Sequence, residues 1–207
     1  MSKKNIIKAF LISTVTALTL RLFVLEDYRI SSDSMKPTLL SGDLVLVSKS
    51  AFNLRFPFTS FELIRTASPE RSDVVAFTVP EKGPETFIKR VVAVGGDKVE
   101  IRKGLLWINN IPASYSPSET PEILRESPVA GKSYEVALGK MGSYQYGPVD
   151  IPKDHFFVLG DNRSESLDSR LWGPIPYSCL KGRVALVWLS VGERGSVRPQ
   201  RWLSTIQ

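Results

Sequence analysis

The sequence predicts a mostly β protein, in which an N-terminal transmembrane helix precedes a barrel-like or sandwich-like β domain. Short runs of β-branched and aromatic residues recur after residue 27, and glycine, proline and aspartate separate them. No later stretch has the apolar period of a long helix. We therefore expect an anchor over 1–26 and a β-rich domain over 27–207, with an insertion or small subdomain at about 110–150.

Composition excludes several classes of protein. The chain of 207 residues is 43% hydrophobic and 23% charged, which is typical of a folded chain rather than a disordered one. Its net charge of +6 is spread out, with no run of five basic residues, so a nucleic-acid surface is not indicated. Cys179 is the only cysteine, which excludes an internal disulfide and a cysteine-based zinc site.

The first expected element is a helix over 5–25. It would span about 31 Å, roughly the hydrocarbon thickness of a bilayer. Lys8 and Arg21 lie near its two ends, where their side chains could reach lipid headgroups. Basic residues before it and the acidic pair at 26–27 favour a cytoplasmic N-terminus and a translocated body. A cleaved signal peptide or an interfacial helix are the alternatives, but no small-residue cleavage site and no single charged face is present.

The body reads as a series of strands. A turn at 41–43 separates the first two, and the stretch at 112–150 is rich in proline, serine, glycine and glutamate with only weak strand patterns. Strands are expected at 28–30, 44–49, 73–79, 86–94, 98–102, 105–109, 134–137, 156–159 and 183–190. This order, without intervening helices, supports the β class.

An aromatic segment follows the second strand. Its apolar residues are Phe52, Leu54, Phe56, Phe58 and Phe61, interrupted by a proline at position 57. Beside a membrane anchor, such a segment predicts a hairpin that enters the bilayer interface. Ordinary core packing is an equally good interpretation.

The segment 32–39 has the sequence Ser-Asp-Ser-Met-Lys-Pro-Thr-Leu. Pro37 cannot donate to a strand ladder and favours an extended residue before it. This predicts an irregular, held loop, which is a place where a nucleophile can be presented to substrate. A serine-rich linker between anchor and domain is the alternative.

Lys89 lies inside the predicted strand 86–94. A period of two residues places it on one face with Phe87, Val91 and Ala93. Loss of solvation there would lower its pKa from about 10.4 by several units, so that a neutral amine could accept a proton from a serine hydroxyl. The alternative is an edge lysine whose ammonium group reaches water.

The segment 160–170 leaves a strand as a turn and alternates acids with bases. Asp161, Arg163, Asp168 and Arg170 could form ion pairs that hold this loop rigid. In a solvated turn such pairs would contribute only ~0–1 kcal/mol each.

Together these three segments resemble the bacterial type I signal peptidases, the membrane-bound serine–lysine peptidases that remove signal peptides. The segment 32–39 resembles the serine box of that family, 42–47 its next strand, and 87–97 its lysine box. The segment 160–170 resembles its Gly-Asp-Asn-Arg box, which continues through Trp172-Gly173 and Gly182-Arg183. The resemblance covers most of 28–190, with the boxes in the same order.

The resemblance implies a mechanism. Ser34 would be the nucleophile and Lys89 the general base, with the Ser32 hydroxyl and the Ser34 backbone N–H forming the oxyanion hole. It also implies that no metal or other cofactor takes part. The substrates would be secretory preproteins with small residues, Ala-x-Ala, ahead of the cleaved bond.

The resemblance assigns supporting roles as well. Ser166 would orient the lysine amine, and Asp168 and Arg170 would form a supporting ion pair. Two positions depart from the family pattern. Gly95 stands where a proline is common, so that turn is expected to be looser, and Cys179 cannot form the disulfide found in some members.

The expected setting is the bacterial cytoplasmic (inner) membrane, in contact with membrane lipid. The N-terminus would be cytoplasmic and the catalytic domain would face the extracytoplasmic (periplasmic) side. An extended substrate would add to an exposed strand edge, for which the strands at 73–79 and 86–94 are candidates.

Three alternatives stay open at this point. One is a self-cleaving regulator with the same chemistry, and another is a non-catalytic, membrane-tethered β domain that binds envelope partners. The third is a histidine-based hydrolase, which would need His155, the only histidine. A place at the end of a strand explains His155 more simply.

Overall fold

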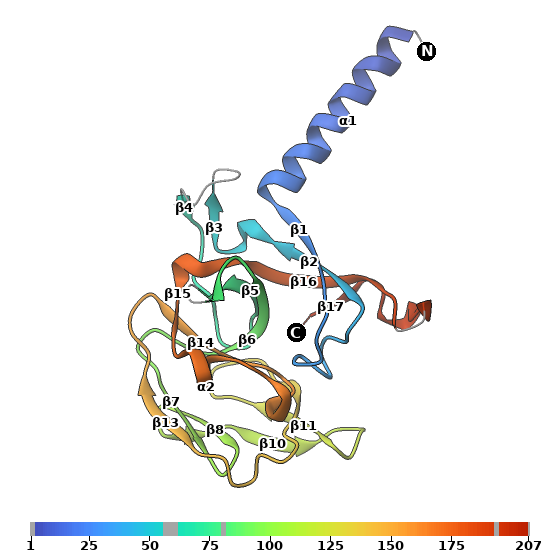
Figure 1. Ribbon diagram of the computed structural model, residues 1–207. Helices are drawn as coiled ribbons and strands as arrows, with labels where there is room; N and C mark the ends of the chain where they lie inside the picture. The colour runs from blue at the N-terminus through green and yellow to red at the C-terminus, as the bar shows by residue number, and fades with distance from the viewer. Residues whose placement is uncertain (1–2, 56–61, 80–81, 193–194, 207) are drawn as a thin grey trace.

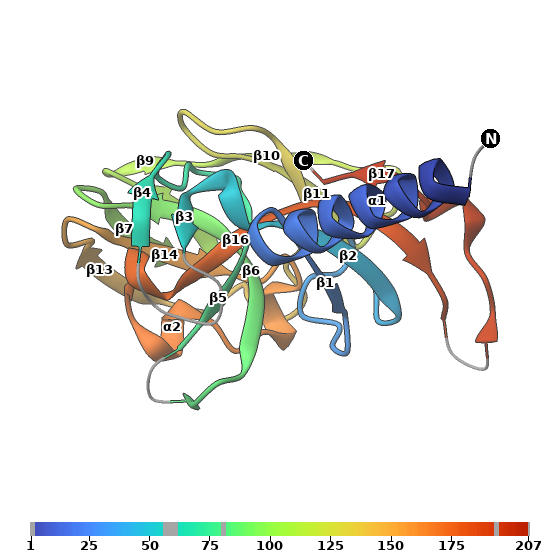
Figure 2. The same cartoon turned by 90° about the horizontal axis from the view of Figure 1, so that it is seen from above.

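A β body with one projecting helix makes up the protein (Figure 1). This computed structural model describes residues 3–55, 62–79, 82–192 and 195–206. Helix α1, over Lys3–Phe23, leaves the body beside β1, and the N-terminus lies at its far end (Figures 1 and 2). The C-terminus lies against the body.

An eight-stranded, curled sheet forms the centre of the body. Its strands lie in the order β1, β2, β16, β5, β6, β14 and β15, and β17 pairs with β16. All of these pairings are antiparallel. The bounds are β1 Leu25–Arg29, β2 Asp43–Ser48, β5 Val74–Thr78, β6 Thr86–Val94, β14 His155–Leu159, β15 Ile175–Pro176, β16 Leu180–Ser190 and β17 Ser204–Thr205.

Within the described residues, three smaller sheets accompany the central one. Two of them lie on the side of the body away from α1 (Figure 1), and the third is the β3–β4 hairpin. Their strands are β3 Asn53–Arg55, β4 Glu62–Arg65, β7 Lys98–Arg102, β8 Leu105–Ile108, β9 Ile111–Pro112, β10 Ser114–Pro117, β11 Ile123–Ser127, β12 Tyr134–Ala137 and β13 Tyr146–Asp150. The described residues also include α2 Ser169–Trp172 and short 3-10 turns at Lys49–Ala51, Arg163–Glu165, Tyr177–Cys179 and Pro199–Arg201.

The core explains why the loop between β1 and β2 is held in place. Met35 and Leu39 of this loop are buried and pack in one cluster with Val45 of β2 and Val184 of β16. Burying a side chain of this size contributes about 1.5–3 kcal/mol. The loop is therefore attached to the sheet at two points, and the serine-rich linker is the wrong interpretation of this segment.

The predicted β class is confirmed, and most predicted strands lie within a residue or two of the observed ones. The last long strand, β16, begins at Leu180, three residues before the prediction. The predicted insertion contains β10, β11 and β12, which form a sheet of their own. The division of the chain at residue 26 stays a prediction.

The predicted transmembrane helix is not found. Helix α1 forms where a helix was expected, but within the described ranges no helix is both long enough and apolar enough to cross a membrane.

The aromatic segment is described only in part. The strands β3 and β4 pair as a hairpin, and Phe52 ahead of them is buried in the core. The residues Phe56, Phe58 and Phe61 lie outside the described residues. Both interpretations of this hairpin, core packing and contact with the bilayer interface, stay open.

Candidate active site

The serine loop places Ser34 inside the body and Ser32 at its surface. Local hydrogen bonds shape the turn: the N–H of Lys36 donates to the Asp33 carbonyl at 3.0 Å, and that of Leu39 to the Met35 carbonyl at 2.9 Å. The side chain of Ser34 is buried, with the residue 7% exposed. The hydroxyl oxygens of Ser32 and Ser34 lie 3.1 Å apart.

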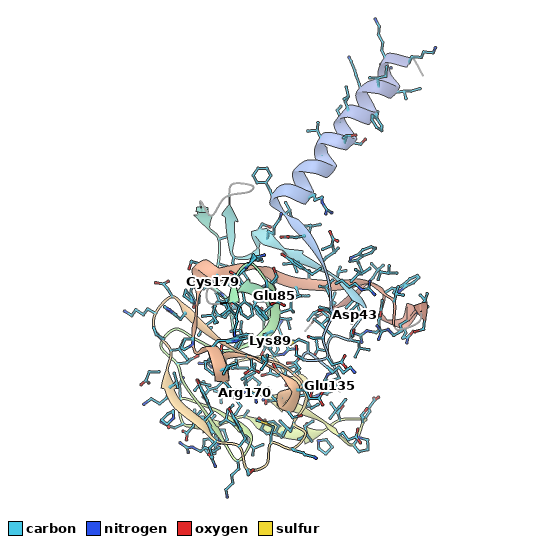
Figure 3. The ribbon with its side chains drawn as sticks, in the orientation of Figure 1. Asp43, Glu85, Lys89, Glu135, Arg170 and Cys179 are labelled. Atoms are coloured by element: carbon cyan, nitrogen blue, oxygen red, sulfur yellow. The ribbon has the colours of Figure 1, made fainter. Side chains whose placement is uncertain are left out.

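Lys89 lies on β6, and its side chain contacts that of Ser34. It lies opposite Val75 in the β5–β6 pair and is 5% exposed. Its Nζ lies 2.7 Å from Ser34 Oγ and 3.1 Å from the Ile88 carbonyl oxygen. Figure 3 shows Lys89 at the centre of the body rather than at its edge. The alternative of an edge lysine that reaches water is therefore wrong.

Burial changes the acidity of this amine. Desolvation lowers the pKa of Lys89 from 10.5 to about 8, although the carboxylates of Asp168 and Asp161 favour the ammonium form and oppose this effect. A neutral amine in hydrogen-bond contact with a serine hydroxyl can act as a general base at moderately alkaline pH.

The Gly160–Asn162 segment fixes the other side of Ser34. The Asn162 N–H donates to the Ser34 carbonyl at 3.1 Å, and the Asn162 side-chain amide donates to the Asp33 carbonyl at 3.3 Å. Gly160 approaches so closely that a Cβ on it would lie 2.5 Å from the Ser34 carbonyl oxygen. Only glycine fits this position without displacing the backbone that carries the serine.

Asp168 and Arg170 form the predicted ion pair. The Arg170 Nε and Nη2 atoms each lie 2.8 Å from one Asp168 carboxylate oxygen, and Asp168 is 1% exposed. The same carboxylate accepts the Gly160 N–H at 3.0 Å. The pair thus supports the turn that contacts Ser34, and this loop is not a solvated turn.

Ser166 lies near the site without the expected contact. Its hydroxyl is buried and has no hydrogen-bond partner within the described part of the chain. It packs against Gly160, and a Cβ on that glycine would collide with it. Its role in orienting the Lys89 amine stays a prediction.

The sequence did not reveal the partners of Asp161 and Arg163, two further charged residues of this loop. Asp161 pairs with Arg90, which is fully buried, through two hydrogen bonds of 2.8 Å. The Thr38 hydroxyl donates to the same carboxylate at 2.5 Å. Arg163 pairs with Glu126 of β11. The alternating charges in the sequence predicted ion pairs within the loop. Asp161 and Arg163 instead pair with residues of other strands.

A cleft of about 330 Å³ opens in front of the serine and lysine. Its apolar wall is formed by Ile30, Met35, Phe87 and Ile88, and its rim carries charged side chains together with the exposed Leu167. The rim charges belong to Arg29, Glu85 and Glu165. The cleft can hold a short apolar chain segment beside the reactive atoms.

One of the two predicted substrate edges is wrong. Strand β5 pairs with β16 on one side and with β6 on the other, so it offers no free edge. Strand β6 pairs with β14 only from Arg90 to Val94. Its first half, Thr86–Ile88, has no strand on that side among the described residues, and it lines the cleft.

His155 has no place in this arrangement. It begins β14, and its Nδ1 lies 2.9 Å from the Lys153 carbonyl oxygen. It does not line the cleft. A histidine-based mechanism therefore lacks its base.

Comparison with known proteins shows what the chain is similar to. A family model described as signal peptidase, peptidase S26, matches residues 3–189. Signal peptidase I of Pseudomonas aeruginosa is 34% identical over 202 residues, which cover 88% of this chain and 71% of that protein. Signal peptidase I of Leptolyngbya laminosa is 31% identical over 200 residues, covering 93% and 83%. A crystal structure of a signal peptidase I from Enterococcus faecalis aligns with 56% of this chain and 96% of that one, at 24% identity and a TM-score of 0.38.

Proposed function

The chain belongs to the signal peptidase family, peptidase S26, and on this basis we propose that Ser34 and Lys89 form the dyad with which it cleaves signal peptides. As a member it is a serine peptidase, that is, a hydrolase that removes signal peptides. The observation that supports the dyad is the 2.7 Å contact between Lys89 Nζ and Ser34 Oγ in a buried site. A non-catalytic β domain would have no need of this contact.

The geometry supports acyl transfer in two steps. Neutral Lys89 accepts the proton of Ser34 Oγ, and this oxygen attacks the carbonyl carbon of the residue before the cleaved bond. The ammonium then returns the proton to the leaving amine, so the peptide bond breaks and an acyl ester remains on Ser34. In the second step Lys89 takes a proton from water, and the hydroxide attacks the ester carbon. The bond between this carbon and Ser34 Oγ then breaks, the Lys89 ammonium returns the proton to Oγ, and the acid product leaves.

The oxyanion of each intermediate needs donors, and Ser32 is positioned to supply one. Its hydroxyl lies 3.1 Å from the attacking oxygen, and the Ser34 backbone N–H would be the second donor. Ser32→Ala should lower kcat by about 10²–10³-fold, the usual loss for one oxyanion donor, with little change in KM. Steady-state kinetics measure this. Ser116→Ala, which removes an exposed hydroxyl on β10, is the matched control, and equal rates for the two variants would contradict the role of Ser32.

The substrate proposal follows from the cleft. Its apolar wall and small volume fit short side chains, as in Ala-x-Ala, while the backbone of an extended preprotein would pair with the open half of β6. This addition supplies main-chain hydrogen bonds and aligns the scissile carbonyl with Ser34. Like the dyad, it requires no metal or other cofactor.

We propose that the protein acts at the bacterial cytoplasmic membrane, with its body on the extracytoplasmic side, where exported preproteins emerge. Contact of α1 with membrane lipid is supported by its exposed apolar side chains, which include Ile6, Phe10, Ile12 and Val15. Cell fractionation tests this. The full chain is expected in the membrane fraction. If a variant without residues 1–23 were recovered there to the same extent, the role proposed for α1 would be contradicted.

Cleavage of a preprotein by the purified, detergent-solubilised chain tests the proposed activity. Mass spectrometry of the products should show one cut directly after an Ala-x-Ala sequence, and changing these alanines to bulky residues should prevent it. Absence of cleavage by the folded wild-type chain would overturn the proposal. Cleavage of the chain itself with no action on a preprotein would favour a self-cleaving regulator.

A further inference from the structure

The small sheet β10–β11–β12 contains a fully buried carboxylate, that of Glu126 on β11. Four donors surround its two oxygens. Arg163 Nη1 and Nη2 lie 2.6 Å from Oε2 and Oε1, the Tyr115 hydroxyl lies 2.6 Å from Oε2, and the Tyr134 hydroxyl lies 2.5 Å from Oε1. Arg163, in turn, is only 3% exposed. The contact therefore joins the small sheet to the loop that supports the catalytic serine.

The carboxylate stays ionised in this setting. Burial alone would raise the pKa of Glu126, but the charge of Arg163 and the hydrogen bonds from Arg163, Tyr115 and Tyr134 hold it below its ordinary value. The guanidinium of Arg163 is held in one orientation by a bidentate contact of this kind. Its remaining Nε donates to the Gly160 carbonyl at 3.1 Å.

Gly160 is the link to Ser34. It lies in close contact with the Ser34 carbonyl, and Asn162, two residues on, donates its N–H to that same carbonyl. The path from Glu126 to the nucleophile thus runs through one guanidinium and one turn. Each step in it is a hydrogen bond or a van der Waals contact between buried groups.

A second path leads from the same sheet to the lysine. The Tyr134 ring lies 4.0 Å from the guanidinium carbon of Arg90, which is the residue next to Lys89 in β6. Arg90 pairs with Asp161, and the Asp161 carbonyl accepts the Ala137 N–H of β12 at 2.9 Å. The small sheet therefore contacts the supports of both members of the dyad.

We propose that Glu126 is a positioning residue for this reaction. Through Arg163 it holds the Gly160–Asn162 turn against Ser34 and so sets the distance between Ser34 Oγ and Lys89 Nζ. This inference rests on the proposed dyad. It gives the segment at 112–150, which the sequence left without a role, the function of supporting the active site.

Glu126→Gln tests this with little change in shape. The glutamine amide would present N–H groups to Arg163 and the tyrosines, which are donors themselves, so the guanidinium would lose its fixed orientation. We expect kcat to fall by about ten- to a hundredfold, because small displacements of reacting groups cost this much, with KM unchanged. The control is Glu122→Gln, which removes the same charge from the exposed turn before β11 and should keep the wild-type kcat.

A double variant shows whether Glu126 acts through Arg163. Glu126→Gln combined with Arg163→Gln should be no slower than the slower single variant, because both changes remove the same support. Should Glu126→Gln fail to fold, Tyr134→Phe gives the same test. It removes one donor and keeps the ring against Arg90, and it should lower kcat severalfold at constant KM.

The outcomes separate this inference from the proposed function. If the folded wild-type chain cleaves preprotein and Glu126→Gln, or Tyr134→Phe in its place, keeps the wild-type kcat, the positioning role is overturned while the dyad stands. A lower melting temperature with unchanged kcat would show that Glu126 serves stability alone. If the wild-type chain does not cleave, the proposed function itself fails.

Discussion

Ser34→Ala and Lys89→Ala should each lower the rate of preprotein cleavage by about 10⁴-fold or more, and the double variant should be no slower than the slower single one. The two side chains perform one proton transfer and one attack, so removing either removes the same step. Lys89→Arg should fail equally, because a guanidinium stays protonated and cannot accept the serine proton. Single-turnover cleavage by purified variants measures these rates.

The controls for this experiment address folding and charge. Each variant should show the circular dichroism and melting temperature of a folded chain. Lys140→Ala removes an exposed lysine on the body and should retain full activity. Substantial turnover by Lys89→Ala would contradict the assignment of the base, and substantial turnover by Ser34→Ala would contradict that of the nucleophile.

Gly160→Ala should also produce a large loss of activity, although it changes no reactive group. The added Cβ would lie 2.5 Å from the Ser34 carbonyl oxygen and closer still to the Ser166 hydroxyl. A carbonyl of the main chain cannot move away without moving Ser34 itself. We expect kcat to fall by about a hundredfold or more, because the serine would no longer be held in line with Lys89.

The matched control is Gly142→Ala. A Cβ at position 142 would meet no atom within 4 Å, and the backbone there does not need the conformational freedom of glycine. Kinetics and thermal unfolding should be measured for both variants. Equal kcat values for Gly160→Ala and the wild type would show that close packing at Gly160 does not position the serine.

Local sequence patterns were sufficient for most of the strands, whereas the choice of Ser34 and Lys89 as chemical candidates also needed the resemblance to the signal peptidases. The alternation around Lys89 identified the strand and placed the lysine on an apolar face, because a period of two residues fixes which side chains share a face. Whether the amine is buried or reaches water was settled only by the structure, in which Lys89 is buried. The distance between Ser34 and Lys89 could not be obtained in this way. They are 55 positions apart, and only the pairing of the strands brings them together.

The errors have the same physical origin. A charged residue in a loop does not reveal its partner from the sequence, so Arg163 was expected to pair within its own loop rather than with Glu126 on another sheet. Strand order is likewise a property of the whole chain, which is why β5 was wrongly expected to be an edge.

The pH dependence of kcat/KM in the wild-type chain tests the dyad most directly. Only the neutral amine of Lys89 can accept the serine proton, so the rate should rise as the pH rises through the pKa of about 8. Below this pKa, each unit of pH should cost about tenfold in rate. Measured from about pH 6 to about pH 10 on folded protein, the predicted result is an acid limb centred near pH 8 and a plateau above it. A limb centred at 10.5, the ordinary lysine value, or a rate that does not change with pH would contradict the account.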